Sequence, residues 1–312
     1  MRSSPKSTLL IKHGSLGDIF LMLGALKDIS EKSGGPIDVL TMGPYAKIFE
    51  RSPFVRKVLV DNRLSFFNFS YLKMLLSYFR KHPYDEIVDL QNSARTYKYR
   101  LLSCNSSNWC QLGTESPENF TFENVTSPVL AKFATQLSQS GYSIAGLIEG
   151  DLGWLCDESA ASTLVGQSNR SVILLPGASA RHQHKIWHGY HALAEILISS
   201  GIDVFIAPGP DDMELCKEMP GQLLLTEGRW LNFFELAGAL SKSSFVVGND
   251  SGPTHLAASL GCNGVALFSS KTERYALNMM RRHMKVMISK SLMDISVDDV
   301  FNKVTSSIAL ED

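Results

Sequence analysis

The segment NDSGPTHLAASLG, residues 249–261, predicts a loop that opens a helix. The apolar run Phe245-Val246-Val247 directly before it predicts a buried strand. Pro253 suits the first helical position, where no backbone N–H is needed, so we expect Gly252 as the N-cap. The succession of strand, loop and helix is the repeating unit of parallel α/β sheets.

The same segment has the composition of an anion-binding site. Gly252 lets a ligand approach the backbone, and Ser251 and Thr254 supply hydroxyl groups. The unpaired N–H groups and the dipole of a helix N-terminus favour negative charge, which predicts a phosphate site. Capping without a ligand explains the pattern equally well, and His255 fits a core or cap histidine as readily as a ligand-binding one.

A second junction of this kind lies near the N-terminus, in LLIKHGSLGD, residues 9–18. It has neither the GxGxxG spacing of dinucleotide-binding loops nor the GxxxxGK[ST] spacing of a P-loop, so nicotinamide binding and NTP hydrolysis are not supported. Asp18 falls where the helix starts. It is either an N-cap or a carboxylate presented at the carboxyl end of the first strand, where open α/β sheets bind ligands.

Four segments resemble, in order and spacing, the motifs of glycosyltransferase family 9, the heptosyltransferases of lipopolysaccharide assembly. They are SLGDIFLMLGAL (15–26), DEIVDLQNSART (85–96), PGASARHQHKIWHGYHALAEIL (176–197) and GNDSGPTHLAASLGCNGVALF (248–268). The resemblance implies the GT-B architecture, with two Rossmann-like domains whose parallel sheets face a central cleft. It also implies inverting, metal-independent transfer from a nucleotide-diphosphate sugar, usually ADP-heptose.

The resemblance also implies roles for individual residues. Asp18 matches the catalytic aspartate, and Lys185, in the Lys-x-Trp pattern, would pair with the diphosphate; an exposed lysine near a helix start is the alternative. Arg181 is a second candidate cation, and Asp250 would anchor the nucleoside or the sugar. The remaining donor-site candidates are Gly17, Ser179, Ser251, Gly252, Thr254 and His255.

The chain departs from the family pattern in two places. Members commonly continue with His-Thr-Leu-Pro after the Gly-Asp pair, whereas this chain has Phe20-Leu21-Met22-Leu23-Gly24 and so lacks a polar group and the kinking proline. Members also carry a Thr or Ser pair in the middle loop, whereas here Ser179 stands between alanines.

Two further sets of side chains are candidates for substrate contacts. Glu214 or Asp212, after a predicted strand, would meet ribose hydroxyls, although acidic residues in the first turn of a helix are common for dipole reasons. Arg95, Lys98 and Arg100 would bind carboxylate or phosphate groups of an acidic acceptor; a solvated helix face is an equal alternative.

The rest of the chain alternates apolar strand patterns with helical ones. Strands are expected at residues 9–12, 37–41, 57–60, 86–90, 171–175, 203–207, 223–225, 245–247 and 265–268. With 312 residues, the chain is expected to form an N-terminal acceptor-binding domain over residues 1–165 and a C-terminal nucleotide-sugar domain over residues 166–312. The final amphipathic segment, 297–308, is expected to cross back onto the first domain.

Composition limits the classes of partner. The 30 basic and 31 acidic residues give no bulk attraction for nucleic acid. The five cysteines (Cys104, Cys110, Cys156, Cys216, Cys262) form no C-x-x-C pair, which indicates a reduced chain without a zinc site. We expect no signal peptide, no membrane-spanning helix, no metal and no cofactor.

The sequence therefore predicts a cytoplasmic, inverting glycosyltransferase that moves a heptose from ADP-heptose to a lipopolysaccharide core or another envelope glycan. Another nucleotide sugar, or a non-catalytic nucleotide-sugar-binding member, are the alternatives. The segment FFNFSYLKMLLSYFRKH, residues 66–82, is the candidate for peripheral contact with the inner face of the membrane. A core-facing helix with a basic end is the favoured interpretation of that segment.

Overall fold

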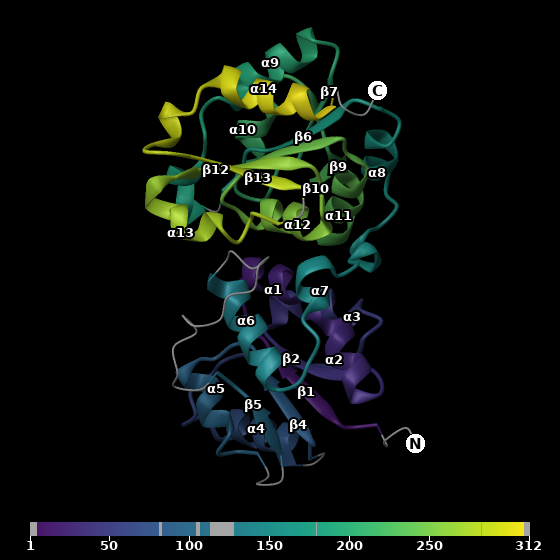
Figure 1. Ribbon diagram of the computed structural model, residues 1–312, viewed down its shortest axis with the longest axis vertical. Coiled ribbons are helices and arrows are strands. Elements are labelled where there is room, and N and C mark those ends of the chain that lie inside the picture. Colours follow the sequence, from purple (N-terminus) through teal and green to yellow (C-terminus); the bar gives the residue numbers. More distant parts are fainter. Residues whose placement is uncertain are drawn as a thin grey trace. The chain divides into compact units, whose positions relative to one another are not determined.

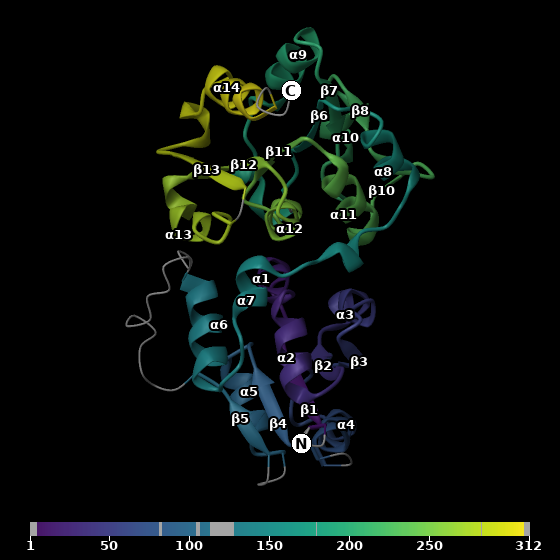
Figure 2. The same ribbon diagram turned by 45° about the vertical axis from the view of Figure 1, so that its right-hand side comes forward.

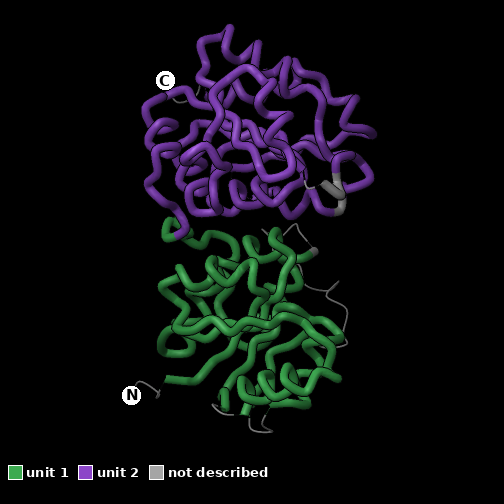
Figure 3. The backbone as a smooth tube through the Cα atoms, turned by 180° about the vertical axis from the view of Figure 1, so that it is seen from behind, with its two compact units in different colours: residues 1–154 green, residues 155–312 purple. Residues whose placement is uncertain are grey.

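The computed structural model describes residues 5–80, 83–103, 107–112, 128–178, 180–281 and 283–308. The chain divides into two compact units, residues 1–154 and 155–312 (Figure 3). The second unit begins before the expected boundary at residue 166, because helix α8 (Ala160–Val165) packs on helix α11 (Phe233–Lys242) of that unit. Each unit is an α/β domain built around a parallel sheet (Figure 1).

The first unit contains a five-stranded sheet in the order β3-β2-β1-β4-β5, with every neighbouring pair parallel. The strands are β1 (Thr8–Ile11), β2 (Ile37–Thr41), β3 (Val55–Val60), β4 (Glu86–Asp89) and β5 (Asn108–Cys110). The expected strands β1 to β4 are all present. Strand β5 was not predicted, because it has only three residues and a polar, exposed beginning.

Helices connect these strands. They are α1 (Leu16–Met22), α2 (Ala25–Ser33), α3 (Ala46–Glu50), α4 (Phe69–Arg80), α5 (Ala94–Tyr99), α6 (Pro128–Gln139) and α7 (Ala145–Glu149). Between α1 and α2 the helical path breaks at Leu23–Gly24. Gly24 lies against helix α7: a Cβ atom there would stand 1.9 Å from the carbonyl oxygen of Gly146. The glycine is therefore needed for this close backbone approach.

The second unit contains a six-stranded parallel sheet in the order β13-β12-β11-β6-β7-β8. The strands are β6 (Ser171–Leu175), β7 (Asp203–Ile206), β8 (Gln222–Leu223), β11 (Phe245–Asn249), β12 (Gly264–Ser269) and β13 (Met284–Ser289). A small antiparallel pair, β9 (Leu225–Thr226) and β10 (Arg229–Trp230), follows β8. Strand β13 was not predicted, since most of its side chains are at least partly exposed and its apolar residues are interrupted by Lys285.

Further helices of this unit are α9 (Tyr190–Ser199), α10 (Met213–Lys217), α12 (Gly252–Leu260), α13 (Glu273–Ala276) and α14 (Val297–Ile308). Short 3-10 helices in the two units are η1 (Gly43–Tyr45), η3 (Gly153–Leu155), η4 (Ala180–Lys185), η5 (Ser270–Thr272) and η6 (Leu292–Asp294). Figure 2 shows the helices of each unit covering its sheet. None of the helices in the described ranges is long and apolar enough to cross a bilayer.

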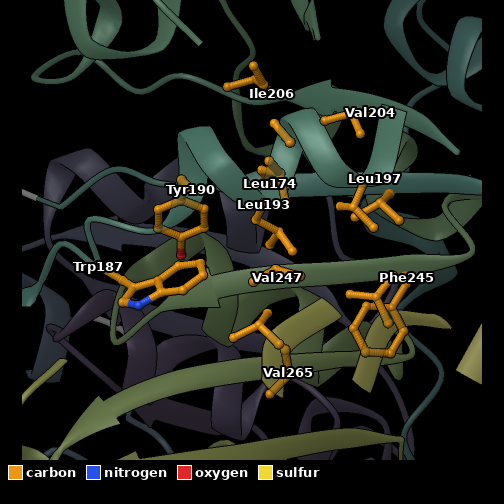
Figure 4. Close-up of a cluster of buried hydrophobic side chains, with 14 of the residues drawn as sticks. Leu174, Trp187, Tyr190, Leu193, Leu197, Val204, Ile206, Phe245, Val247 and Val265 are labelled. Carbon is orange, nitrogen blue, oxygen red and sulfur yellow. The ribbon is translucent and has the colours of Figure 1, made fainter. Parts of the chain in front are cut away.

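The main core of the second unit lies between its sheet and helices α9 and α14. Leu193 and Leu197 of α9 pack with Val247 and Val265 of the sheet (Figure 4). Helix α14 buries Val300, Val304 and Ile308 in the same core and contacts α9. The apolar face of this final segment is therefore used within the second unit.

Both sheets reverse their strand order at one position, between β1 and β4 in the first unit and between β6 and β11 in the second. At such a switch point the loops after the two strands diverge to opposite faces and leave room for a ligand. The loops after β1 and β4 carry the Gly-Asp and DLQ motifs. The loops after β6 and β11 carry the middle and C-terminal motifs. The structure therefore brings the motifs together in pairs.

Candidate functional site

The loop after β1 presents Asp18 on the third residue of helix α1. Ser15, not Asp18, is the N-cap residue, so the capping alternative for Asp18 is wrong. The carboxylate keeps about a third of its surface exposed and accepts a hydrogen bond from Lys12 Nζ at 3.1 Å. A partly exposed carboxylate at a switch point, not used as a cap, can accept a proton from a bound hydroxyl group.

Lys12 is the unexpected member of this pair. Its side chain is 3 % exposed, and Nζ lies 5.2 Å from the centroid of the Phe133 ring. Burial lowers the pKa of Lys12 below its ordinary value, and the charges of Asp18 and Asp89 oppose that shift. Sequence reasoning did not predict this role, since a lysine at the end of a strand is usually exposed to solvent.

The DLQ motif holds the loop that carries Asp18. Gln91 Oε1 accepts hydrogen bonds from the backbone N–H groups of His13 (3.0 Å) and Gly14 (3.2 Å). Asp89, fully buried, in turn accepts from the backbone N–H groups of Gln91 and Asn92. The loops after β1 and β4 are thus joined across the switch point, and Gln91 fixes the backbone from which Asp18 projects.

A buried polar network adjoins this loop. The Asp61 carboxylate, 0 % exposed, accepts hydrogen bonds from the hydroxyls of Tyr71 (2.6 Å) and Tyr99, and from the Arg63 backbone N–H (2.7 Å). His13 Nε2 lies 2.9 Å from Asp61 Oδ2. Burial alone would raise the pKa of Asp61, but these partners outweigh it and hold the pKa far below its usual value. Asp61 is therefore a buried anion stabilised by its donors.

Arg95, a candidate for acceptor binding, is tied into this network. Its guanidinium donates to the Tyr71 and Tyr99 hydroxyls, at 3.0 Å each, and to the Leu64 carbonyl. Its central carbon lies 4.8 Å from the centroid of the Phe66 ring. These contacts give Arg95 a structural task, which is to fix the loop after β3 against helix α5.

Lys98 and Arg100 are more available than Arg95 for binding an external ligand. Both are exposed, and neither belongs to an ion pair with a described residue. Lys98 lies on α5 with Nζ 5.8 Å from the Phe66 ring, and Arg100 is the C-cap residue of that helix. These two side chains can reach an external anion with little rearrangement.

In the second unit, Lys185 and Asp250 meet at the switch point. Lys185 Nζ donates to Asp250 Oδ2 at 2.6 Å, with the two side chains 21 % and 8 % exposed. Lys185 ends η4 in the loop after β6, and Asp250 directly follows β11. The structure therefore brings these two predicted residues together, although 65 residues separate them. A partly exposed ammonium group such as that of Lys185, close in sequence order to the N-terminus of the helix after Asp250, is suited to bind an anionic ligand.

Asn249 fixes both halves of this arrangement. Its side-chain Nδ2 donates to the Pro176 carbonyl at 2.7 Å, and its Oδ1 accepts from the Trp187 backbone N–H (3.2 Å) and the Tyr190 hydroxyl (3.1 Å). Trp187, the tryptophan of the Lys-x-Trp pattern, is buried and donates through Nε1 to the Ile295 carbonyl. The two residues therefore anchor the loop that carries Lys185, a role that sequence reasoning did not assign to Asn249.

Helix α12 begins one residue earlier than predicted. Ser251 is the N-cap, with Gly252 and Pro253 as the first two helical residues. Its hydroxyl caps no backbone N–H and instead lies 3.2 Å from the Thr254 hydroxyl. Thr254 is fully buried, and a Cβ atom on Gly248 would stand 2.3 Å from its Oγ1. Thr254 therefore supports the loop from within, and the backbone N–H groups of the first turn are left as the donors for a phosphate.

The acidic candidates after β7 differ in exposure. Glu214 is 86 % exposed on the side chain and pairs with Lys217 at 2.7 Å on the outside of α10. Asp212 is buried, and its Oδ1 accepts from the Gly209 backbone N–H. A Cβ atom on Gly177 would collide with its Oδ2, so the Asp212 carboxylate abuts the loop after β6. Burial raises the pKa of Asp212 above its usual range.

The structure gives less information on the other predicted site residues. Ser179 and the side chain of Arg181 lie outside the described part of the structure. Gly17 lies in the first turn of α1, and His255 is a half-buried residue of α12. Among the described residues, no three His, Cys, Asp or Glu side chains gather as a metal site would require.

A model of a known protein family matches part of the chain. The model of glycosyltransferase family 9 (heptosyltransferase) matches residues 148–299. The predicted resemblance to family 9 is confirmed. The family 9 segment contains both Lys185 and Asp250, and no curated protein sequence matches the chain significantly.

Solved structures give the same fold over nearly the whole chain. The E. coli heptosyltransferase WaaC with ADP has a TM-score of 0.72 at 17 % identity, covering 96 % of this chain and 99 % of WaaC. The E. coli ADP-heptose LPS heptosyltransferase II has a TM-score of 0.73 at 18 % identity, covering 98 % and 99 %. A family 9 glycosyltransferase from Veillonella parvula has a TM-score of 0.75 at 16 % identity, covering 98 % of each chain. The predicted GT-B fold is confirmed.

Proposed function

We propose that this protein is an inverting glycosyltransferase that moves a heptose from ADP-heptose to an acidic envelope glycan such as a lipopolysaccharide core. The observation that carries the proposal is the Lys185–Asp250 pair at the β6/β11 switch point, inside the segment that matches family 9. Two structural neighbours support the choice of donor: one is WaaC with ADP and another is WaaC with ADP-2-deoxy-2-fluoro heptose.

In the proposed reaction, the acceptor hydroxyl oxygen attacks the anomeric carbon of the donor. The bond between that carbon and the diphosphate oxygen breaks, and Asp18 takes the hydroxyl proton. The nucleoside diphosphate leaves with the bonding electrons. Its negative charge is stabilised by Lys185 and by the first backbone N–H groups of α12. Configuration at the anomeric carbon is inverted because a single displacement occurs.

Lys185 also solves an electrostatic problem in the donor site. Asp250 is nearly buried next to the expected diphosphate, and two anions in a shielded site repel each other. A lysine ammonium bound to Asp250 removes this conflict and leaves the second carboxylate oxygen for a donor hydroxyl group. Asp212, with its raised pKa, is the other group that we place near the ribose. No step of this scheme uses a metal ion.

The decisive test is turnover with ADP-heptose and a deacylated lipopolysaccharide core, followed as release of ADP. A thermal-shift series with ADP-, UDP- and GDP-sugars identifies the base, since only a ligand of the native state raises the melting temperature. Release of UDP or GDP in preference to ADP would correct the donor. Saturable binding of ADP-heptose with no ADP release in the presence of acceptors would instead indicate a non-catalytic nucleotide-sugar-binding protein.

A further inference from the structure

All the exposed large apolar side chains among the described residues of the first unit lie in two short segments. They are Leu64, Phe67 and Phe69 in the loop after β3 and at the start of α4, and Tyr97 and Leu101 on or next to α5. Phe67 and Phe69 are 93 % and 86 % exposed. Helix α4 itself does face the core, through Tyr71, Leu75 and Phe79, so the favoured interpretation is right for the helix and wrong for the aromatic residues at its start.

The two segments are fastened together. Arg95 on α5 donates to the Leu64 carbonyl and stacks on Phe66, whose ring also lies 5.8 Å from Lys98 Nζ. Within the loop, Asn68 Oδ1 accepts from the Tyr71 N–H at 3.0 Å and so caps α4. Phe67 and Phe69 therefore project from an ordered base. Their exposure is a property of the fold rather than of a loose loop.

The charge of this surface is one-sided. Residues 62–80 and 91–103 contain Arg63, Lys73, Arg80, Arg95, Lys98 and Arg100, and no aspartate or glutamate. The whole chain is almost balanced, with 30 basic and 31 acidic residues. Exposed aromatic side chains among basic residues match the boundary of an anionic bilayer, where rings enter the acyl region and cations meet lipid phosphates. A symmetric contact with a second copy would instead oppose like charges.

We propose that residues 63–69 together with helix α5, here called the aromatic–basic surface, dock this protein on an anionic lipid bilayer. Phe67 and Phe69 enter the bilayer, and Arg63, Lys98 and Arg100 bind lipid phosphates. The loops after β3 and β4 open at the carboxyl edge of the sheet, the edge at which Asp18 also lies. Docking would therefore deliver a lipid-linked acceptor to that edge, and this consequence alone rests on the proposed function.

Co-sedimentation of the full chain with vesicles tests the proposal without donor or acceptor. We expect binding to phosphatidylcholine vesicles containing about a third phosphatidylglycerol, and much weaker binding to pure phosphatidylcholine. The Phe67→Ser/Phe69→Ser variant should lower the partition coefficient by at least about tenfold, because two rings lose their apolar burial. Lys98→Gln/Arg100→Gln should lower it by roughly fivefold per charge, an effect that high salt removes.

Matched controls separate docking from folding defects. Met293, 80 % exposed in the second unit, gives the control Met293→Ser, which should bind vesicles like the wild type. Phe67→Trp should retain binding and show a blue shift of its fluorescence on anionic vesicles. Thermal unfolding and the ADP-induced thermal shift of the serine variant should equal those of the wild type, since neither ring packs in the core.

Three results would overturn the proposal. One is equal binding of wild type and the Phe67→Ser/Phe69→Ser variant to anionic vesicles, or no binding by either. Another is a dimer in sedimentation velocity that this variant abolishes, which would assign the surface to a second copy. The third is tighter binding to single-stranded nucleic acid than to anionic vesicles, with the same side chains required. Failure of catalysis would leave the vesicle result unaffected.

Discussion

Lys12 Nζ and Asp18 Oδ2 form a 3.1 Å ion pair in which the lysine is buried and the carboxylate is partly exposed. Because the lysine is almost fully buried, its ammonium group is shielded from solvent and has the Asp18 carboxylate as its partner. The ion pair therefore fixes the direction of that carboxylate. Gln91 holds the backbone of the same loop from the other side of the switch point. Asp18 is thus positioned by two residues that lie just after the neighbouring strands β1 and β4.

The first prediction concerns Asp18. Asp18→Asn preserves the shape of the side chain but cannot accept the hydroxyl proton, so turnover should fall by roughly 10²–10⁴-fold with nearly unchanged donor affinity. Steady-state kinetics together with ADP titration by calorimetry measure the two effects. Turnover within a few-fold of the wild type would reject Asp18 as the base.

The second prediction concerns Lys12, which we regard as a positioning residue. Lys12→Met keeps the apolar stem in its buried site and removes the charge. We expect a loss of turnover smaller than that of Asp18→Asn, roughly tenfold. The loss should fall on kcat and leave the KM for the donor nearly unchanged, because only the direction of the Asp18 carboxylate is affected. A purely structural role would instead lower the free energy of unfolding and leave kcat of the folded protein in place.

The third prediction concerns the diphosphate. Lys185→Ala should weaken binding of ADP by about tenfold or more and binding of adenosine far less, because the lysine is placed on the phosphates. Lys217→Ala is the control, since Lys217 is an exposed lysine paired with Glu214 in the same unit. Equal losses for ADP and adenosine would place Lys185 away from the phosphates.

The fourth prediction concerns stability and pH. The pKa of Asp61 is lowered in the folded protein from an ordinary value of 3.8, so its carboxylate stabilises the fold above that pH. The contribution shrinks as the pH falls below 3.8 toward the folded value. Asp61→Asn puts an amide donor among hydroxyl donors and should cost about 3 kcal/mol at pH 6.

Urea unfolding of wild type and Asp61→Asn at several pH values measures this difference. It should stay constant from about pH 7 to 5 and become smaller below pH 4, because Asp61 of the unfolded wild type then takes up a proton while Asp61 of the folded protein stays ionised, which favours unfolding. A difference that grows on acidification would show that the Asp61 pKa is raised instead, and that burial outweighs its donors.

The sequence was a good guide to the strands and a poorer one to the support of the site. Long apolar runs such as residues 171–175 have no alternative to burial, whereas the short β5 carries too few apolar residues to be recognised. Asp18 was placed at a helix start, but Lys12 and Asn249 act through partners far away or across a loop. Such tertiary contacts leave no periodic signal in the sequence.

The one-residue error at helix α12 has a local cause. Gly252 and Ser251 are both acceptable N-caps, and Pro253 is tolerated at the second helical position as well as at the first. For Arg95 the sequence suggested a function that the structure does not favour. A basic residue in a loop or helix after a strand is typical of a site for an external anion. Only the positions of Tyr71, Tyr99 and Phe66 show that its guanidinium is already engaged.

The last prediction is that chelators leave activity intact. A metal-dependent transferase holds a divalent cation with acidic side chains to neutralise the leaving diphosphate. Here Lys185 and the N-terminus of α12 supply positive charge at the place where we put the diphosphate. The adjacent Asp211 and Asp212 are the strongest argument for a metal, yet Asp212 is buried with a raised pKa and is the N-cap residue of α10. Turnover should therefore survive excess EDTA within a few-fold. Complete loss on chelation, restored by Mg²⁺ or Mn²⁺ in wild type and not in Asp211→Asn/Asp212→Asn, would move the chemistry to those two carboxylates.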